Sequence, residues 1–210
     1  MIPSEELKRR LADCPLIAII RGVTPEEVEE HGAAISEAGI GIIEVPLNSP
    51  RPFDSISRLA AALGDRALIG AGTVLDAEDV ARAQDAGGGI VVSPDTNPAV
   101  ITAAARAGLI STPGFFTPSE ASEALRAGAH GLKLFPAEAA TPAVLRAHKA
   151  VLPPHVPLIV VGGVRPDTMS AWIQAGAAGF GLGSGLYRPG QSAGETAVKA
   201  RAYVEGATSR

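Results

Sequence analysis

The sequence predicts an α/β fold, a single (β/α)8 TIM barrel that spans residues 1–210. Two observations predict it. Short apolar runs alternate with amphipathic segments of helical length, and a glycine that ends a helix recurs about every 20 to 25 residues, with one interval doubled unless Pro153 is counted. Eight strand-then-helix units fit a chain of 210 residues. The competing fold is a doubly wound open sheet, whose Gly-rich fingerprint after the first strand does not occur at Arg21-Gly22-Val23-Thr24.

The predicted strands are the apolar runs, each closed by glycine, proline, serine or threonine. They lack a strict apolar–polar alternation, which indicates strands buried on both faces, as in a parallel sheet. In chain order they are Pro15–Ile20, Ile40–Val45, Ala67–Ala71, Ile90–Val92, Leu109–Ser111, Gly131–Phe135, Leu158–Val161 and Ala178–Leu182.

The predicted helices lie between these runs and carry signals at both ends. A cap, a proline in the first turn and acidic residues mark three helix starts, at Thr24-Pro25-Glu26-Glu27, Thr117-Pro118-Ser119-Glu120 and Arg165-Pro166-Asp167. Glycines in a left-handed conformation are predicted to stop helices at Gly39, Gly64, Gly87, Gly108, Gly128 and Gly176.

Composition limits the partners and the compartment. Lys plus Arg is 18 and Asp plus Glu is 22, so the net charge of −4 argues against nucleic acid or an anionic membrane as the partner. The single cysteine, Cys14, excludes a disulfide framework and fits a reducing compartment. The first ten residues lack the apolar centre of a signal peptide, and no apolar run reaches the roughly 18 residues of a membrane span. We therefore expect a cytoplasmic protein.

In a barrel of this kind, the active site lies at the C-terminal ends of the strands. The candidate residues are therefore those that close the apolar runs. Among the lysines, Lys8, Lys149 and Lys199 lie in helical stretches, whereas Lys133 interrupts the apolar strand Gly131–Phe135. Burial lowers the pKa of an unpaired ammonium, and a partly neutral lysine is a nucleophile that forms a Schiff base with a carbonyl.

The carboxylates separate in the same way. Nearly all lie on helix faces or helix starts, but Glu44 interrupts the strand Ile40–Val45. Strand alternation places Glu44 and Lys133 inside the barrel if Ile43, Val45, Leu132 and Leu134 pack outward against the helices. The two charges are then either a structural ion pair or a nucleophile with its general acid/base, and the sequence favours the catalytic pair.

Further strand ends suggest substrate contacts. Gly162-Gly163 and Gly183-Ser184 follow the seventh and eighth runs, where these barrels commonly bind phosphate, although close packing alone would also explain the glycines. The Thr73 hydroxyl suits a carboxylate or phosphate oxygen. Arg21 closes the first run and suits a substrate carboxylate, with a surface arginine as the alternative.

A metal site is not expected. The histidines are scattered and no pair has the spacing of metal ligands. They are His31, His130, His148 and His155.

Four segments resemble the class I aldolases of 2-keto-3-deoxy-6-phosphosugar acids. They cover nearly the whole chain in the expected order: Glu44-Val45-Pro46-Leu47-Asn48-Ser49-Pro50, Ile69-Gly70-Ala71-Gly72-Thr73-Val74-Leu75, Leu132-Lys133-Leu134-Phe135-Pro136 and Gly181-Leu182-Gly183-Ser184.

The resemblance implies a role for each matching position. Lys133 would form the Schiff base, and Glu44 would be the acid/base. The substrate would be bound by Arg21 and Thr73 at its carboxylate end and by Gly163, Gly183 and Ser184 at its phosphate, while Val161 would help to set the stereochemical preference. The resemblance further implies a homotrimer in the cytoplasm, with no metal and no cofactor.

Within the family, the chain resembles the galactonate-type members more closely. Asn48 stands where gluconate-type members have arginine, and Val161 where they have threonine. The implied reaction is the reversible cleavage of 2-dehydro-3-deoxy-6-phospho-D-galactonate to pyruvate and D-glyceraldehyde 3-phosphate. The alternatives are the gluconate epimer or both epimers, and more remotely a phosphate-binding isomerase or epimerase, or a binding protein, neither of which forms an imine.

Overall fold

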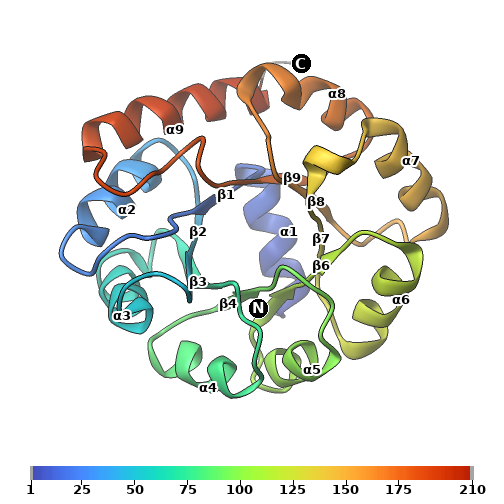
Figure 1. The fold of residues 1–210 in the computed structure, drawn as a ribbon, viewed down its shortest axis with the longest axis horizontal. Helices are drawn as coiled ribbons and strands as arrows, with labels where there is room; N and C mark the ends of the chain where they lie inside the picture. The colour runs from blue at the N-terminus through green and yellow to red at the C-terminus, as the bar shows by residue number, and fades with distance from the viewer. Residues whose placement is uncertain (1, 209–210) are drawn as a thin grey trace.

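The structure is a computed structural model that describes residues 2–208, in which strands and helices alternate along the chain (Figure 1). The strands are β1 (Leu16–Ile19), β2 (Ile42–Pro46), β3 (Leu68–Gly72), β4 (Ile90–Val92), β5 (Ile110–Thr112), β6 (Gly114–Phe115), β7 (Leu132–Leu134), β8 (Leu158–Val161) and β9 (Gly179–Leu182). The helices are α1 (Pro3–Asp13), α2 (Val28–Glu37), α3 (Pro52–Leu63), α4 (Glu78–Asp85), α5 (Pro98–Arg106), α6 (Pro118–Ala127), α7 (Pro142–Val151), α8 (Met169–Gln174) and α9 (Ala193–Thr208), with short 3-10 turns η1 (Ala137–Ala139) and η2 (Pro166–Thr168).

The strands form a parallel barrel, which confirms the predicted (β/α)8 fold. Their order is β5-β4-β3-β2-β1-β9-β8-β7-β6. The two end members, β5 and β6, belong to one segment, residues 110–115, interrupted by Pro113, which has no N–H to donate to a neighbouring strand. Because β5 pairs with β4 and β6 pairs with β7, this segment joins both ends of the sheet. The predicted run Leu109–Ser111 covers only its first half.

Side chains along each strand alternate between the barrel interior and the layer of helices outside. Ile43, Val45, Leu132 and Leu134 belong to the outer core that packs on the helices. The interior core is a separate cluster to which most strands contribute, and its buried members are Leu7, Leu11, Ile17, Ile19, Ile42, Ile90, Val92, Ile110, Ile159 and Val161. Glu44 lies between Ile43 and Val45, and Lys133 lies between Leu132 and Leu134. Both line a cavity inside the barrel with Ile17 and Ile19, which confirms their predicted inward orientation.

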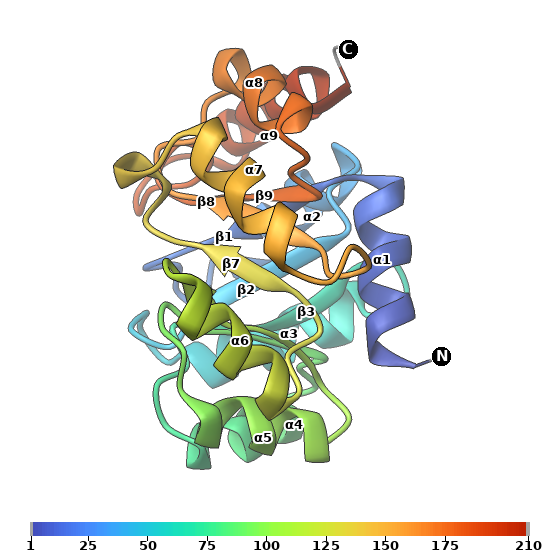
Figure 2. The same cartoon turned by 90° about the vertical axis from the view of Figure 1, so that its right-hand side faces the viewer.

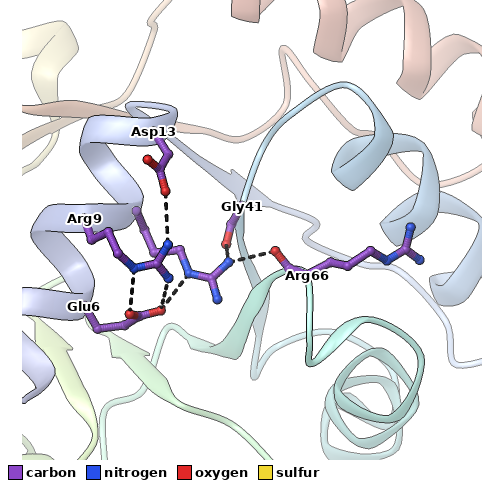
Figure 3. Close-up of polar contacts among 6 residues, drawn as sticks. Glu6, Arg9, Asp13, Gly41 and Arg66 are labelled. Atoms are coloured by element: carbon purple, nitrogen blue, oxygen red, sulfur yellow. Dashed lines mark hydrogen bonds and ion pairs between the residues drawn. The ribbon is translucent and has the colours of Figure 1, made fainter. Parts of the chain in front are cut away.

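Helix α1 closes the N-terminal end of the barrel, where it lies across the strand ends (Figure 2). Its Leu7 is fully buried in the interior core. The Arg10 guanidinium donates hydrogen bonds to the carbonyl oxygens of Gly41 (3.4 Å) and Arg66 (2.7 Å), just before β2 and β3, and pairs with Glu6 (Figure 3). Because α1 closes this end of the barrel, a ligand can reach the interior only from the C-terminal ends of the strands.

The predicted helix starts are confirmed in part. Thr117 and Glu120 form a capping box at the start of α6, and the segment Arg165-Pro166-Asp167 enters η2, which continues into α8. The predicted start at Thr24 is wrong, because α2 begins only at Val28. The Glu27 carboxylate accepts hydrogen bonds from the Thr24 N–H and from the hydroxyl of Tyr187, in the loop after β9. These two bonds stabilise a turn at residues 24–27, ahead of the helix.

Most of the predicted glycine stops are confirmed by positive φ angles, at Gly39, Gly87, Gly108, Gly128 and Gly176. Gly64 is the exception, with φ of −55° in the right-handed region. The amides of Arg66 and Ala67 both donate to the Leu63 carbonyl, so the chain leaves α3 through a further turn. Within residues 2–208, no helix is long and apolar enough to cross a bilayer.

Candidate active site

A cavity of about 540 Å³ opens at the C-terminal ends of the strands, opposite α1. The predicted site residues in its walls are Arg21, Lys133, Val161, Gly163, Gly183 and Ser184. The remaining two lie beside it: Glu44 lines a smaller cavity together with Lys133 and Val161, and Thr73 accepts a hydrogen bond from Arg21. The structure thus brings all the predicted site residues to one end of the barrel.

Lys133 lies in the middle of β7 and is only 6% exposed. Its ammonium nitrogen is 4.9 Å from the centre of the Phe135 ring, two residues further along the same face. Burial lowers the pKa of the Lys133 ammonium; the Glu44 carboxylate opposes this effect, and the Arg21 charge adds to it. A lysine with a lowered pKa is neutral more often near pH 7 and is therefore a better nucleophile.

Glu44 lies in β2 and is 1% exposed. Burial raises its pKa from 4.5 to about 7, against the opposing effects of the Lys133 and Arg21 charges. A carboxyl group with a pKa near 7 both accepts and donates protons readily at neutral pH. The glycine at position 72 on β3 makes room for it, because a Cβ there would collide with the Glu44 carboxylate.

Lys133 and Glu44 interact through their charges, and the described residues show no hydrogen bond or ion pair between them. The Glu44 Oε2 atom has no hydrogen-bond partner within residues 2–208, and no ion pair joins it to Lys133. A structural ion pair would satisfy both groups at once. The open arrangement leaves the amine and the carboxyl available to a third molecule between the strands.

Arg21 follows β1 and is held at the cavity by the ends of the next two strands. Its guanidinium donates one hydrogen bond to Asn48 Oδ1 and another, of 3.3 Å, to Thr73 Oγ1. Thr73 has a φ of 54°, a left-handed conformation that β-branched residues rarely adopt. Strained backbone of this kind concentrates at functional sites. The fixed guanidinium suits a planar carboxylate.

The glycine loops after β8 and β9 line the same cavity, and β9 pairs directly with β1, the strand that Arg21 follows. Gly162 and Gly163 both have positive φ angles, 116° and 62°. Within residues 2–208, the backbone N–H groups of Gly163 and Ser184 have no acceptor. The Arg188 side chain donates a 3.0 Å hydrogen bond to the Ser184 carbonyl and brings a positive charge to this loop. Free amides beside a cation favour an anion such as phosphate.

Several lining residues were missed by the sequence reasoning. Phe135 could have been found, since it lies two residues after Lys133 on one strand face. Glu138 lies against Gly162 and Gly163, while Arg165 and Arg188 reach the cavity from loops. No periodic signal marks these three, because loop residues are placed by tertiary contacts.

Among the described residues, no histidine lines the cavity. His31 is buried and its Nδ1 lies 2.8 Å from Thr196 Oγ1. His130 accepts a hydrogen bond from the Ser111 amide. No group of three or more His, Cys, Asp or Glu side chains placed to hold a metal occurs among residues 2–208, and metal-independence stays a prediction.

Comparisons with known proteins agree with this geometry. The family model described as "Aldolase: KDPG and KHG aldolase" matches residues 7–197. The chain is 48% identical over 191 residues to the 2-dehydro-3-deoxy-6-phosphogalactonate aldolase of Escherichia coli (strain K12), which covers 91% of this chain and 93% of that protein.

Two solved structures share the fold closely. The "Native KDPGal structure" has a TM-score of 0.90 at 47% identity, with 91% of this chain and 93% of that chain covered. A cube-shaped protein cage, designed by fusing symmetric oligomeric domains, also gives a TM-score of 0.90 at 47% identity, over 91% of this chain and 71% of that chain. The family match extends over most of the sequence and over the barrel that carries the cavity. The chain therefore belongs to the KDPG and KHG aldolase family.

Proposed function

We propose that the protein is a class I, Schiff-base aldolase that reversibly cleaves 2-dehydro-3-deoxy-6-phospho-D-galactonate to pyruvate and D-glyceraldehyde 3-phosphate. The observation that carries the proposal is the buried amine of Lys133, which lines a 540 Å³ cavity and shares a smaller one with Glu44. Desolvation favours its neutral, nucleophilic form, and a carbonyl compound in the cavity would meet it directly.

The first stage is imine formation. The Lys133 nitrogen adds to the C2 ketone of the substrate to give a carbinolamine. Loss of water from this intermediate gives an iminium ion, which accepts an electron pair readily. The apolar walls around Lys133, including Ile159 and Val161, exclude bulk water from this stage.

The second stage is carbon–carbon cleavage. Glu44 removes the proton from the C4 hydroxyl, the C3–C4 bond breaks, and its electron pair moves to the iminium to form an enamine. Glyceraldehyde 3-phosphate leaves with the new C4 aldehyde. Glu44 then returns a proton to C3, and hydrolysis of the pyruvate iminium regenerates the free amine of Lys133.

The two ends of the substrate have different partners in this proposal. The carboxylate at the pyruvate end is bound by Arg21 and Thr73. The phosphate is bound by Gly163, Gly183 and Ser184, whose loops follow β8 and β9 and line the same cavity. The side chain at position 161 contacts the substrate beside Lys133 and helps to set the stereochemical preference.

Three observations favour the galactonate epimer. Asn48 and Val161 stand where gluconate-type members of the family have arginine and threonine. The Escherichia coli relative that is 48% identical is named for the galactonate compound. Measurement of kcat/KM for both epimers tests this choice, and a higher value for the gluconate epimer would overturn it.

Borohydride trapping tests the Schiff base. The protein is incubated with pyruvate and borohydride, and its intact mass and peptide map are recorded. We expect one reduced pyruvyl group on the peptide that contains Lys133, retained in Lys8→Met, whose lysine is exposed, and lost in Lys133→Met. Absence of the adduct in the folded wild-type protein would make Lys133 a structural cation and favour an isomerase without an imine.

Replacement of Glu44 by glutamine separates the two stages. Loss of the acid/base is expected to lower kcat by about 10²- to 10⁴-fold, the usual contribution of general acid–base catalysis. Trapping of pyruvate at Lys133 is expected to persist in part, because imine formation does not depend on the C4 proton. Near-normal turnover of Glu44→Gln would remove the role assigned to this residue.

We further propose that the enzyme is a homotrimer in the cytoplasm. The similarity to a cage built from symmetric oligomeric domains supports self-association, and apolar Leu75 and Phe116 are 47% and 36% exposed. A phosphorylated sugar acid does not cross an apolar bilayer and is used in the compartment where it is made. Light scattering is expected to give three times the chain mass of 21.3 kDa, and a monomer would contradict the trimer.

A further inference from the structure

Thr112 has a buried hydroxyl that the mechanism does not use. It ends β5, is 1% exposed, and its Oγ1 has no hydrogen-bond partner within residues 2–208. Ile110, two residues earlier on the same face, belongs to the interior core. Buried hydroxyls in folded proteins are normally hydrogen-bonded, to protein or to an ordered water molecule.

The second unpartnered atom in this part of the barrel is Oε2 of Glu44. Thr112 and Glu44 line the same small cavity, together with Lys133. They reach it from three separate strands, β5, β2 and β7. The residues that carry two unpartnered buried oxygens and one ammonium thus line the same small cavity.

This cavity has the size of a site for one water molecule, and three of the residues that line it carry polar groups. Its volume is about 10 Å³, at the lower end of the roughly 10–15 Å³ that one water requires. A buried water needs two to four polar partners, and the three groups supply that number. The other lining residues are apolar or glycine: Ile17, Ile19, Val92, Ile159, Val161 and Gly181.

We infer that Thr112 is a positioning residue, whose hydroxyl, together with Lys133, holds one water molecule against Oε2 of Glu44. The inference rests on the proposed aldolase function and deepens it, because it assigns a support to the acid/base. The water gives the buried carboxylate a hydrogen-bond donor, and Thr112 keeps that donor in place. In this role, neither the Thr112 hydroxyl nor the water reacts with the substrate.

The consequence is a change in the titration of Glu44. Hydrogen bonds donated to a carboxylate favour its ionised form and lower its pKa. The charged groups that face Glu44 are Lys133 on β7 and Arg21 at the end of β1. The walls from β4, β8 and β9 are Val92, Ile159, Val161 and Gly181, whose side chains offer the carboxylate no hydrogen-bond donor. In this proposal the water supplies that donor.

Thr112→Val tests the inference, because valine keeps the shape and removes the hydroxyl. We expect the acidic limb of the pH profile of kcat/KM to move upward by about half a pH unit or more, since the pKa of Glu44 rises when a donor is lost. Thr112→Ser restores the hydroxyl and is expected to return the limb to the wild-type position. Ser55→Ala removes another buried, unpartnered hydroxyl, on α3, and is expected to leave the profile unchanged.

A second measurement is independent of turnover. The Glu44 carboxyl is titrated by ¹³C NMR, with its signal assigned by its loss in Glu44→Gln, and Thr112→Val is expected to raise its pKa. An unchanged Glu44 titration in folded Thr112→Val would overturn the inference, even if the melting temperature fell. Failure of pyruvate trapping in the wild type would instead overturn the Schiff-base proposal, and the NMR titration would still decide the role of Thr112.

Discussion

The burial of Glu44 couples the stability of the protein to pH. Its pKa is about 7 in the folded protein, against an ordinary value of 4.5. Between these pH values, the folded protein retains a proton that the unfolded chain releases, so stability falls as the pH rises. The contribution of Glu44 is therefore fully present below about pH 4.5 and is lost as the pH passes about 7.

Glu44→Gln is accordingly expected to raise the free energy of unfolding at pH 8, by roughly 1–3 kcal/mol, because the amide needs no deprotonation in an apolar site. The gain at pH 5 should be clearly smaller. Urea titrations at both pH values measure the difference, with Glu123→Gln, at an exposed position on α6, as the matched control. An equal change at the two pH values would show that Glu44 does not titrate as described.

Val161 is the residue that we propose to help set the epimer preference. It is 6% exposed at the end of β8 and lines both cavities, next to Lys133. Val161→Thr keeps the shape and adds a hydroxyl that can contact a substrate oxygen. We expect the ratio of kcat/KM values to shift toward the gluconate epimer, by about tenfold for one hydrogen bond. Unchanged ratios in a variant with normal pyruvate trapping would remove Val161 from this role.

Among the elements, α1 has a structural role that is separate from the site. It closes the end of the barrel opposite the cavity through Leu7 and Leu11 in the interior core and through Arg10 on two backbone carbonyls. Without α1, the apolar residues at the N-terminal ends of the strands would be exposed to water.

Leu7→Ala is expected to lower the free energy of unfolding by about 2–5 kcal/mol, the usual cost of truncating a buried leucine. The kcat/KM of the folded variant at low temperature is expected to stay within about twofold, because the barrel separates α1 from the site. Denaturant unfolding and steady-state kinetics measure the two quantities, with exposed Lys8→Ala as control. A large loss of kcat/KM without loss of stability would contradict this division.

At the scale of the whole molecule, the barrel brings strands from both ends of the chain together at the proposed substrate site. Arg21 and Thr73 come from β1 and β3, whereas the glycine loops follow β8 and β9. In the proposed function, strands from the beginning and from the end of the sequence therefore bind one small molecule, together with Lys133 on β7.

Removal of the substrate phosphate is expected to lower kcat/KM by about 10²-fold or more, because binding at a remote group helps to orient the reacting carbons. The comparison uses the phosphorylated and unphosphorylated sugar acids. Arg188→Gln, which removes the positive charge beside the free amides, should reduce activity toward the phosphorylated substrate and leave the unphosphorylated one nearly unaffected. Equal losses for both substrates would place the phosphate elsewhere.

The sequence by itself determined the barrel and the inward orientation of its two buried charges. These features depend on local patterns: apolar runs, helix caps, glycine stops, and the alternation that places Glu44 and Lys133 opposite the outward Ile43 and Leu132. The capping box at Thr117 was predicted for the same reason, since all its hydrogen bonds lie within four residues.

Only the tertiary structure decided which side chains meet across the barrel. The cavity shared by Thr112 and Glu44, the hydrogen bonds of Arg21 to Asn48 and Thr73, and the closure by residues 110–115 all depend on contacts between different strands. Local periodicity tells which face a side chain takes, but the stagger of the strands and the closure of the sheet decide its neighbours across the interior. The turn at Thr24 follows the same rule, because a contact from the loop after β9 stabilises Glu27 ahead of the helix.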